Sequence, residues 1–249
     1  MPNAWDVGSA KVLVDIGFSA LATTSSGFAA TLGRLDGSVT RDEAIEHGRA
    51  LSAAVDVPVS ADLEGGFADD LDGIAETYRL AAASGLAGGS IEDATGDADD
   101  PVHPVDRAVE QVAAAVEAAH ADGRGFVLTA RAENFLYGKT DLADIIDRLQ
   151  RYQEAGADVL FAPGVTAPDD IRALVTSVDR PVNVLAIGNA PSVAGLAELG
   201  VARISVGGGL AFAALGALVN AGRELLEQGT YGYRALAMEG AKAVRGAFR

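Results

Sequence analysis

Short apolar runs alternate with longer helical stretches along most of the chain, and this alternation constrains the fold more than any other feature. The apolar runs are Ala20–Thr24, Val57–Asp62, Gly89–Asp93, Gly125–Arg131, Ala157–Pro163, Pro181–Ala186 and Arg203–Gly207. The helical stretches are Arg41–Val55, Leu71–Ser84, Val105–His120, Asp141–Ala155, Pro168–Val178 and Ser192–Leu199. Because the runs lack the polar alternation of half-exposed strands, they predict a parallel sheet covered by helices.

The segment Met1–Asn3 would supply the end of one more strand, which makes eight. We therefore predict an α/β fold, a closed (β/α)8 barrel of the TIM type; an open doubly wound sheet is the alternative, because that first strand is so short. We expect residues 1–249 to form a single barrel domain, since no linker or low-complexity segment divides them. Residues 210–249 exceed the one helix that closes a barrel, so we expect extra C-terminal helices there, exchanged with or packed against another subunit.

The net charge is −16, from 35 acidic and 19 basic residues, which argues against nucleic acid and an anionic membrane as partners. An anionic substrate would need a local arginine or a metal ion to reverse this field. No apolar run reaches the roughly 18 residues of a membrane span, and the first residues do not resemble a signal peptide, so we expect a soluble, cytoplasmic protein. The absence of cysteine excludes disulfides, thiolate metal sites and a cysteine nucleophile.

Acidic residues follow three successive strands of the expected barrel. They are Asp62 and Glu64, then Glu92 and Asp93, then Glu133. Catalytic groups of such barrels project from the carboxyl ends of the strands, so these side chains should meet at one mouth, where their repulsion calls for a cation. Oxygen ligands suit Mg²⁺, and Mn²⁺ is also possible. The alternative is that these acids only cap helices or face solvent.

Arg131 directly follows a strand that should be buried, so its guanidinium needs a partner. That partner would be a substrate carboxylate or oxyanion, or alternatively Glu92 or Glu133 in a structural ion pair, and the two interpretations are not exclusive. The turn Ser25–Gly27 offers hydroxyls and backbone N–H groups, which bind anions in many proteins, although such turns are common.

Two loops remain open to two interpretations. Gly207–Gly209 follows the last strand, where barrels often bind phosphate, but it would serve equally as a tight turn. Residues 94–104 are rich in Asp, Gly and Pro and should form a mobile lid. His103 within it is either a proton donor or a solvated side chain.

Together, the strand-end segments resemble the isocitrate lyase/phosphoenolpyruvate mutase superfamily, over essentially the whole chain. The segments that carry this resemblance are Pro2–Asp6, Ala22–Gly27, Ala61–Gly66, Ser90–Asp93 and Ala130–Phe135. The resemblance implies a Mg²⁺-dependent barrel that makes or breaks a C–C or P–C bond next to a 2-oxo acid, through an enolate of the pyruvate type. It also implies a homo-oligomer, a dimer or tetramer whose subunits exchange the eighth helix.

The resemblance also assigns roles to individual residues. Those implied for the metal are Asp62, Glu64 and Glu92; those implied for catalysis are Arg131, Asp36 and Glu92; and those implied for binding a small anionic 2-oxo acid are Ser25, Ser26, Gly27, Arg131 and Asn183.

The chain departs from the superfamily pattern in the loop that sets specificity. Residues 94–103 lack the Lys-(Lys/Arg)-Cys-Gly-His loop of the lyases, and also the lysine and asparagine of the mutase and phosphonopyruvate hydrolase loop. Glu64 stands where an aspartate is usual. We therefore expect a lyase that cleaves a C–C bond by decarboxylation or retro-aldol or Claisen-type chemistry, with a proton from water, the lid or Tyr137. The alternatives are a P–C bond enzyme and a non-catalytic barrel that binds a 2-oxo acid.

Overall fold

A computed structural model describes residues 1–248 of the chain. The strands within these residues are β1 (Leu21–Ala22), β2 (Val59–Asp62), β3 (Gly88–Glu92), β4 (Val127–Arg131), β5 (Val159–Phe161), β6 (Val182–Leu185) and β7 (Arg203–Ser205). The helices are α1 (Val7–Asp15), α2 (Ser25–Thr31), α3 (Arg41–Ala54), α4 (Leu71–Ala83), α5 (Val105–His120), α6 (Leu142–Glu154), α7 (Pro168–Ser177), α8 (Val193–Glu198), α9 (Gly209–Glu227) and α10 (Arg234–Ala247), with a 3-10 turn η1 (Asn134–Tyr137).

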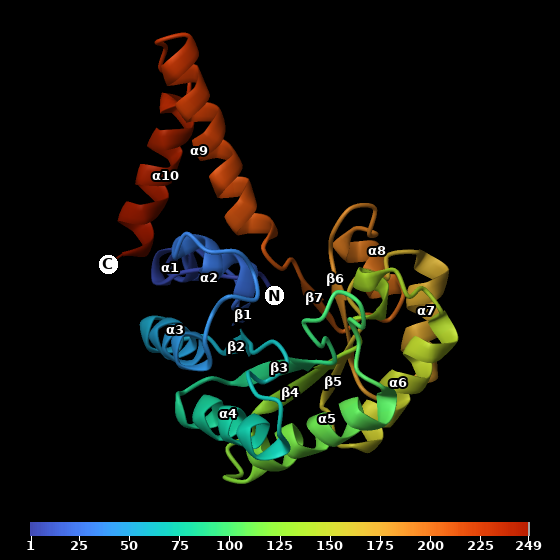
Figure 1. Ribbon diagram of the computed structural model, residues 1–249. Helices are drawn as coiled ribbons and strands as arrows, with labels where there is room; N and C mark the ends of the chain where they lie inside the picture. Colours follow the sequence, from blue (N-terminus) through green and yellow to red (C-terminus); the bar gives the residue numbers. More distant parts are fainter. Residues whose placement is uncertain (249) are drawn as a thin grey trace.

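All neighbouring strands pair in parallel, in the order β1-β2-β3-β4-β5-β6-β7. Helices α1 to α8 surround the strands, as Figure 1 shows. The register aligns Glu92 with Arg131 and Arg131 with Phe161, so the carboxyl ends of β3, β4 and β5 meet at the same edge. This edge is where the sequence predicted the functional residues.

The N-terminal segment bridges the first and last strands of the ring. The carbonyl of Pro2 accepts a hydrogen bond from Ala22 N at 2.9 Å, and the nitrogen of Met1 donates to the Ile204 carbonyl at 2.7 Å. The Asn3 side chain also accepts hydrogen bonds from the backbone beyond β7. The expected barrel is therefore confirmed over the open sheet, and the predicted eighth strand is this short segment.

The two faces of each strand have different surroundings. On β4, Leu128 and Ala130 are fully buried against the helices, while Thr129 and Arg131 point into the barrel. Large buried side chains such as Tyr78 on α4 fill the space between helices and strands. Much of the core that stabilises the fold thus lies between the strands and the helices, and the side chains of β4 that point into the barrel are polar.

Helices α1 and α2 were not predicted from the sequence. Helix α1 begins at a capping box in which Asp6 accepts from Ser9 N at 2.6 Å and the Ser9 hydroxyl accepts from Asp6 N. Helix α2 begins where a turn was expected, because Thr24 caps it by accepting from Gly27 N. Both helices are short, so their hydrophobic periodicity is weak.

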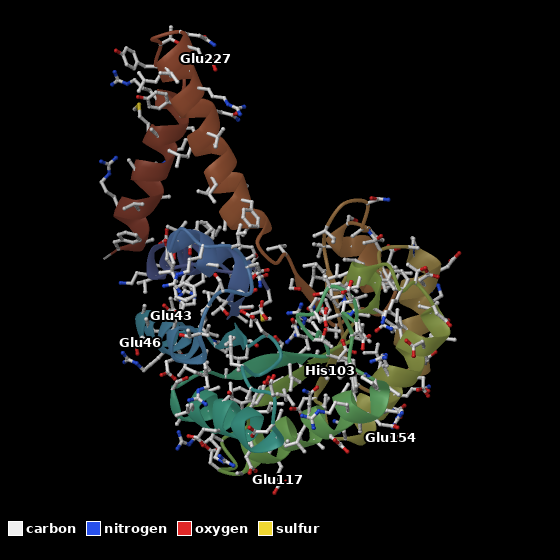
Figure 2. All side chains as sticks on the ribbon, in the orientation of Figure 1. Glu43, Glu46, His103, Glu117, Glu154 and Glu227 are labelled. Carbon is white, nitrogen blue, oxygen red and sulfur yellow. The ribbon has the colours of Figure 1, made fainter. Side chains whose placement is uncertain are left out.

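Helices α9 and α10 form the expected extra C-terminal elements and project from the ring as a hairpin, with Glu227 near its tip (Figures 1 and 2). The turn between them is held by Glu224, whose carboxylate accepts hydrogen bonds from Thr230 Oγ1, Gly232 N and Tyr233 N. The hairpin exposes a row of large apolar side chains: Leu210, Phe212, Leu215, Leu218, Val219, Leu225, Leu226, Tyr231, Leu236, Met238, Val244 and Phe248.

Among residues 1–248, helix α9 alone is long and apolar enough to cross a membrane, judged by length and composition only, with a mean hydropathy of 1.2. This differs from the expectation that no segment would reach that length. The helix carries Arg223, Glu224 and Glu227 in its last turns, and Ala211 in its first turn is buried. We therefore interpret its apolar face as a surface for contact with protein.

We predict that the full chain forms a dimer or tetramer in which this hairpin is covered. Leu226→Glu should lower the molar mass in light scattering to that of one chain, or cause aggregation, because it places a charge in the covered surface. Leu35→Glu is the matched control, since Leu35 and Leu226 are both 86% exposed in the single chain. Truncation after Gln228 should have the same effect as Leu226→Glu, and a stable, active monomer from that truncation would refute the prediction.

Candidate functional site

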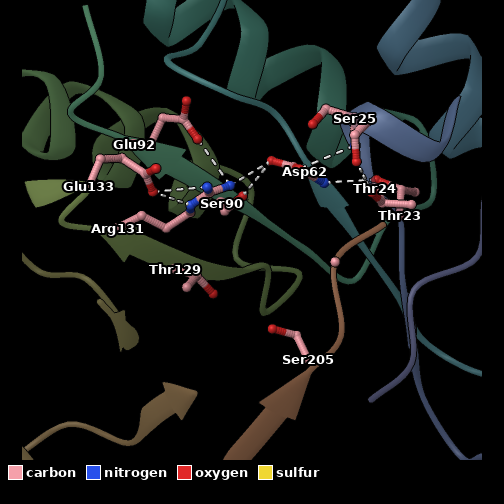
Figure 3. A network of polar contacts seen from close by, with 12 residues as sticks. Thr23, Thr24, Ser25, Asp62, Ser90, Glu92, Thr129, Arg131, Glu133 and Ser205 are labelled. Atoms are coloured by element: carbon pink, nitrogen blue, oxygen red, sulfur yellow. Dashed lines mark hydrogen bonds and ion pairs between the residues drawn. The ribbon is translucent and has the colours of Figure 1, made fainter. Parts of the chain in front are cut away.

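Arg131 lies at the centre of the candidate site, at the end of β4, with three carboxylates around it (Figure 3). Its Nη1 atom lies 3.0 Å from Asp62 Oδ1 and 3.0 Å from Glu92 Oε2. Its Nε and Nη2 atoms each lie 2.9 Å from Glu133 Oε1. The predicted structural ion pairs of Arg131 are thus present, and one positive charge faces three negative ones.

The pKa values in this cluster reflect the excess of negative charge. Burial raises the pKa of Glu92 well above its usual range; Arg131 opposes the rise, and the charges of Glu133, Asp62 and Glu64 add to it. Burial alone would lower the pKa of Arg131, but the three carboxylates around it raise that pKa well above the usual value. Arg131 therefore stays charged, and the charged form of Glu92 is disfavoured by burial and by the neighbouring carboxylates.

Asp62 links this cluster to the start of α2. Its Oδ2 atom accepts a hydrogen bond from Ser25 N at 3.2 Å, and its Oδ1 atom accepts from Ser90 Oγ at 3.4 Å. Its backbone nitrogen donates to Thr23 Oγ1 at 2.8 Å. In this structure the Ser25 backbone thus contacts a protein carboxylate, and the predicted contact of Ser25 with a substrate carboxylate stays a prediction.

A second group of side chains supports the cluster from behind. Asp93 accepts from Glu133 N at 2.8 Å, from Arg148 Nη1 at 3.0 Å and from the Tyr152 hydroxyl at 2.6 Å. Arg148 also donates to the His103 carbonyl at 2.9 Å, which ties the 94–104 loop to α6. The sequence analysis missed Arg148 and Tyr152. Their spacing of four residues, which places two polar side chains on one face of an amphipathic helix, was the signal that could have found them.

A cavity of about 760 Å³ opens beside the cluster, and all of the predicted residues Ser25, Asp36, Glu64, Glu92 and Arg131 line it. Asp36 comes from the exposed loop between α2 and α3. The cavity therefore brings together residues that lie more than 100 positions apart in the sequence.

His103 and Tyr137 line the same cavity from its outer side. The 94–104 loop is more regular than expected, because Ala94 and Val102 form an antiparallel bridge and Val102 is buried. Its position over the cavity suits a lid, and its mobility stays a prediction.

Glu64 has an unusual backbone and an unusual charge state. Its φ of 47° lies in the left-handed region, which is uncommon for a residue other than glycine. Burial raises the pKa of Glu64 to about 7, with the charges of Asp62 and Asp36 adding to the rise. Backbone strain of this kind gathers at functional sites. The carboxyl is thus held where its charge is costly unless a cation lies nearby.

The donors of this cluster suit a divalent cation bound partly through water. Within residues 1–248, no three His, Asp or Glu side chains lie close enough to surround one ion directly. Mg²⁺, however, keeps several waters and takes only one or two protein carboxylates directly. The oxygen donors of Asp62, Glu64 and Glu92, with their excess negative charge, fit such an ion, and these residues stay the predicted metal site.

The other predicted binding residues lie deeper or to one side. Ser26 and Asn183 line a second cavity of about 210 Å³ inside the barrel, which Arg131 also lines. Gly27 is buried, and a Cβ atom there would lie 2.6 Å from Thr24 Cγ2. Gly27 thus allows close packing at the start of α2. The roles of Ser26, Gly27 and Asn183 in binding a substrate stay predictions.

The chain is similar in sequence and structure to known enzymes of one superfamily. The model of the family described as phosphoenolpyruvate phosphomutase matches residues 1–226. A crystal structure from Burkholderia cenocepacia J2315, named a putative lyase/mutase, is 51% identical, with a TM-score of 0.95 and coverage of 98% of this chain and 89% of that chain.

Two further relatives have named activities. An oxaloacetate decarboxylase of Bradyrhizobium sp. (strain ORS 278) is 30% identical over 197 residues, which are 76% of this chain and 65% of the relative. The structure of a phosphonopyruvate hydrolase in complex with oxalate and Mg²⁺ is 25% identical, with a TM-score of 0.84 and coverage of 98% of this chain and 89% of that chain.

The raised pKa of Glu64 predicts how the stability of the metal-free protein depends on pH. A carboxyl whose pKa rises from 4.5 to about 7 on folding stabilises the fold below pH 4.5 and loses this contribution as pH rises through 7. In excess chelator, Glu64→Gln should lack this loss. Between pH 4.5 and 8, the free energy of unfolding of the original chain should fall by about 2 kcal/mol more than that of Glu64→Gln. This figure is smaller than the full pKa shift implies, because solvent screens a partly exposed carboxyl. Urea unfolding at a series of pH values measures it.

Glu117→Gln is the control for that experiment. It removes the same charge from the outer surface of α5, away from the cavity (Figure 2), and should keep the profile of the original chain. Identical profiles for Glu64→Gln and the original chain would show that Glu64 is not held in a costly environment.

Proposed function

Because this chain belongs to the phosphoenolpyruvate phosphomutase family, within the superfamily that includes isocitrate lyase, we propose that it is a Mg²⁺-dependent lyase. Its substrate would be a small 2-oxo acid or a related carboxylate, cleaved at a C–C bond by decarboxylation or a retro-aldol or Claisen-type step. The observation that carries this proposal is the Arg131 guanidinium among three carboxylates, beside a cavity of about 760 Å³ at the barrel mouth.

Asp62, Glu64 and Glu92 would hold the metal, with Mn²⁺ as a possible substitute for Mg²⁺. Such an ion, when bound, supplies Lewis-acid polarisation of the oxo and carboxylate oxygens of the substrate. Its charge would also favour the ionised forms of Glu64 and Glu92, whose pKa values are raised by burial and further by neighbouring carboxylates. The mouth of this acidic barrel would then accept an anion.

Arg131 would stabilise the negative charge that develops on the 2-oxo oxygen when the C–C bond breaks. Its guanidinium is fixed by Glu133 at 2.9 Å, so it needs no reorientation during the reaction. Tyr137 is our candidate for the group that returns a proton to the enolate carbon. Burial raises the pKa of Tyr137, with the charges of Glu92 and Glu133 adding to the rise, so the hydroxyl keeps its proton at neutral pH.

Cleavage of a C–C bond is favoured over cleavage of a P–C bond by the charge of the loop beside the cavity. Residues 94–104 carry Asp97, Asp99 and Asp100 and no lysine or arginine. A phosphonate group bears more negative charge than a carboxylate, so this loop would repel it more strongly. We also propose that the active form is a homo-oligomer in which the α9–α10 hairpin packs against a neighbouring copy.

We predict that the chain releases pyruvate from at least one of oxaloacetate, methylisocitrate and phosphonopyruvate, and only with Mg²⁺ or Mn²⁺ present. Asp62→Asn keeps the shape of the side chain but removes a charge from the metal site. It should lower kcat/KM by about 100-fold or more and shift Tm by no more than about 2 °C, because two carboxylates still contact Arg131. A coupled assay for pyruvate and a thermal melt measure the two effects.

Asp170→Asn, which removes an equal charge from the first turn of α7, is the control and should leave kcat/KM unchanged. Full turnover in excess chelator would contradict the role of the metal. Metal-dependent binding of oxalate without turnover of any of the three acids would instead support the non-catalytic 2-oxo-acid-binding barrel.

A further inference from the structure

The side chain of one partly buried arginine extends across the interior of the barrel and takes no part in the site at the mouth. Arg203 begins β7, and its Nη2 atom donates to Thr129 Oγ1 on β4 at 2.9 Å. Strand β7 pairs with β6 and is three places from β4 in the sheet order, so this contact spans the barrel interior. The Arg203 Nε atom donates to Asn183 Oδ1 at 3.0 Å. The guanidinium is thus fixed by neutral side chains on two strands.

Arg203 carries a positive charge without an opposite charge beside it. Within residues 1–248, its guanidinium forms an ion pair with no carboxylate, and its other N–H groups have no protein acceptor. Burial lowers the pKa of Arg203 to about 10, which leaves it charged at neutral pH. A guanidinium inside a protein is ordinarily paired with an anion. Arg131, on the next inward position after Thr129, contacts three carboxylates, so the two arginines contrast sharply.

The space beside Arg203 is suited to a small polar ligand. Arg203 lines the cavity of about 210 Å³, together with the hydroxyl-bearing residues Ser60, Ser90 and Ser205. This volume is several times the roughly 30 Å³ that one water molecule takes up in the liquid, so it has room for a small ion and accompanying water. Most TIM barrels fill this region with branched apolar side chains. Here small hydroxyl side chains leave it open.

The cavity also adjoins the mouth and has a fixed polarity. Ser25, Asp36 and Arg131 line both this cavity and the larger one at the mouth, so the two are adjacent. The acids Asp36 and Asp62 lie at the mouth end, where Asp62 is paired with Arg131. The unpaired cation lies at the opposite end. In the metal-free protein, a ligand with negative charge in this cavity would therefore be stabilised at the Arg203 end.

We propose that the cavity above Arg203 is a binding site for a small carboxylate anion, separate from the metal site at the barrel mouth. The planar fork of the guanidinium matches the two oxygens of a carboxylate. The hydroxyls of Ser60 and Ser205 would donate the additional hydrogen bonds, since that of Ser90 donates to Asp62. The carboxylate is either a free anion or the distal carboxylate of a dicarboxylic ligand whose other end lies at the mouth. The site exists whether or not the chain has the lyase activity proposed above.

Formate is the probe, and the readout is the Tm of the full chain in excess chelator, so that no metal at the mouth can bind the probe. Sodium chloride at equal ionic strength is the reference solution. Formate at about ten times its Kd should raise Tm by about 3 °C, since a ligand that binds only the folded state stabilises it. Arg203→Met, which keeps the length and packing of the side chain, should lose this rise.

Arg180→Met is the matched control, because Arg180 is exposed before β6 and the variant has the same net charge as Arg203→Met. It should keep the full response to formate. Arg203→Lys tests the site in a second way, since it keeps the charge but loses the fork, and its Kd for formate should rise several-fold. Equal formate responses in the original chain, Arg203→Met and Arg203→Lys would overturn the proposal, as would the absence of any response in the original chain.

Two further conditions separate the sources of the carboxylate. Both conditions add Mg²⁺. Saturating oxalate has no carboxylate beyond the two that chelate the metal, whereas 2-oxoglutarate carries a further carboxylate three carbons beyond its oxo group. A formate response that survives oxalate but is lost with 2-oxoglutarate supports the distal carboxylate of a ligand. A response that survives both supports a free anion. Neither measurement depends on turnover, so a failure of the proposed lyase activity would leave the result interpretable.

Discussion

The ion pairs of Arg131 are the interaction on which the barrel mouth depends. Strands β2 and β3 each end in a carboxylate, and a third follows β4, so without the guanidinium their parallel register would bring together three negative charges. Arg131 removes part of this repulsion and fixes the direction of each carboxylate. It does not remove all of it, because one positive charge faces three carboxylates. The remaining negative charge is what a divalent cation would compensate, so the same contacts that stabilise the mouth also prepare it for a metal.

Much of the fold could be predicted from the sequence, because the strands of a parallel barrel are apolar runs and its functional groups directly follow them. Asp62, Glu92 and Arg131 were found in this way, and the structure brings them together. Arg203 was not singled out, because an arginine beside a strand in an acidic chain is ordinarily a surface residue that pairs with a neighbour. Its contact with Thr129 joins strands three places apart. A contact across the barrel leaves no local pattern that a sequence argument can detect.

The C-terminal hairpin illustrates a different limit. The sequence indicated two apolar helices beyond the barrel, and α9 and α10 are present with the turn near Gly229. Their apolar side chains nevertheless remain exposed in the single chain. The end of α10 packs against α1, where a Cβ atom on Gly246 would lie 3.0 Å from Asp15 Oδ2. Apolar periodicity shows that a face will be covered, but it does not identify what covers it. For that reason the oligomer is a proposal even though its helices are observed.

Charged and neutral polar side chains share the interior of the barrel. Carboxylates surround Arg131 at the mouth, whereas Asn183 and Thr129, which are neutral, contact Arg203 in the inner cavity. Such an interior contributes little apolar burial, so the stability of the fold must come from the contacts between the outer faces of the strands and the helices. Because the interior side chains contribute little to this core, they can be polar without destabilising the fold. One small barrel could then hold both the proposed cation site and the proposed anion site, because the carboxylates near Arg131 and the guanidinium of Arg203 lie on different strands.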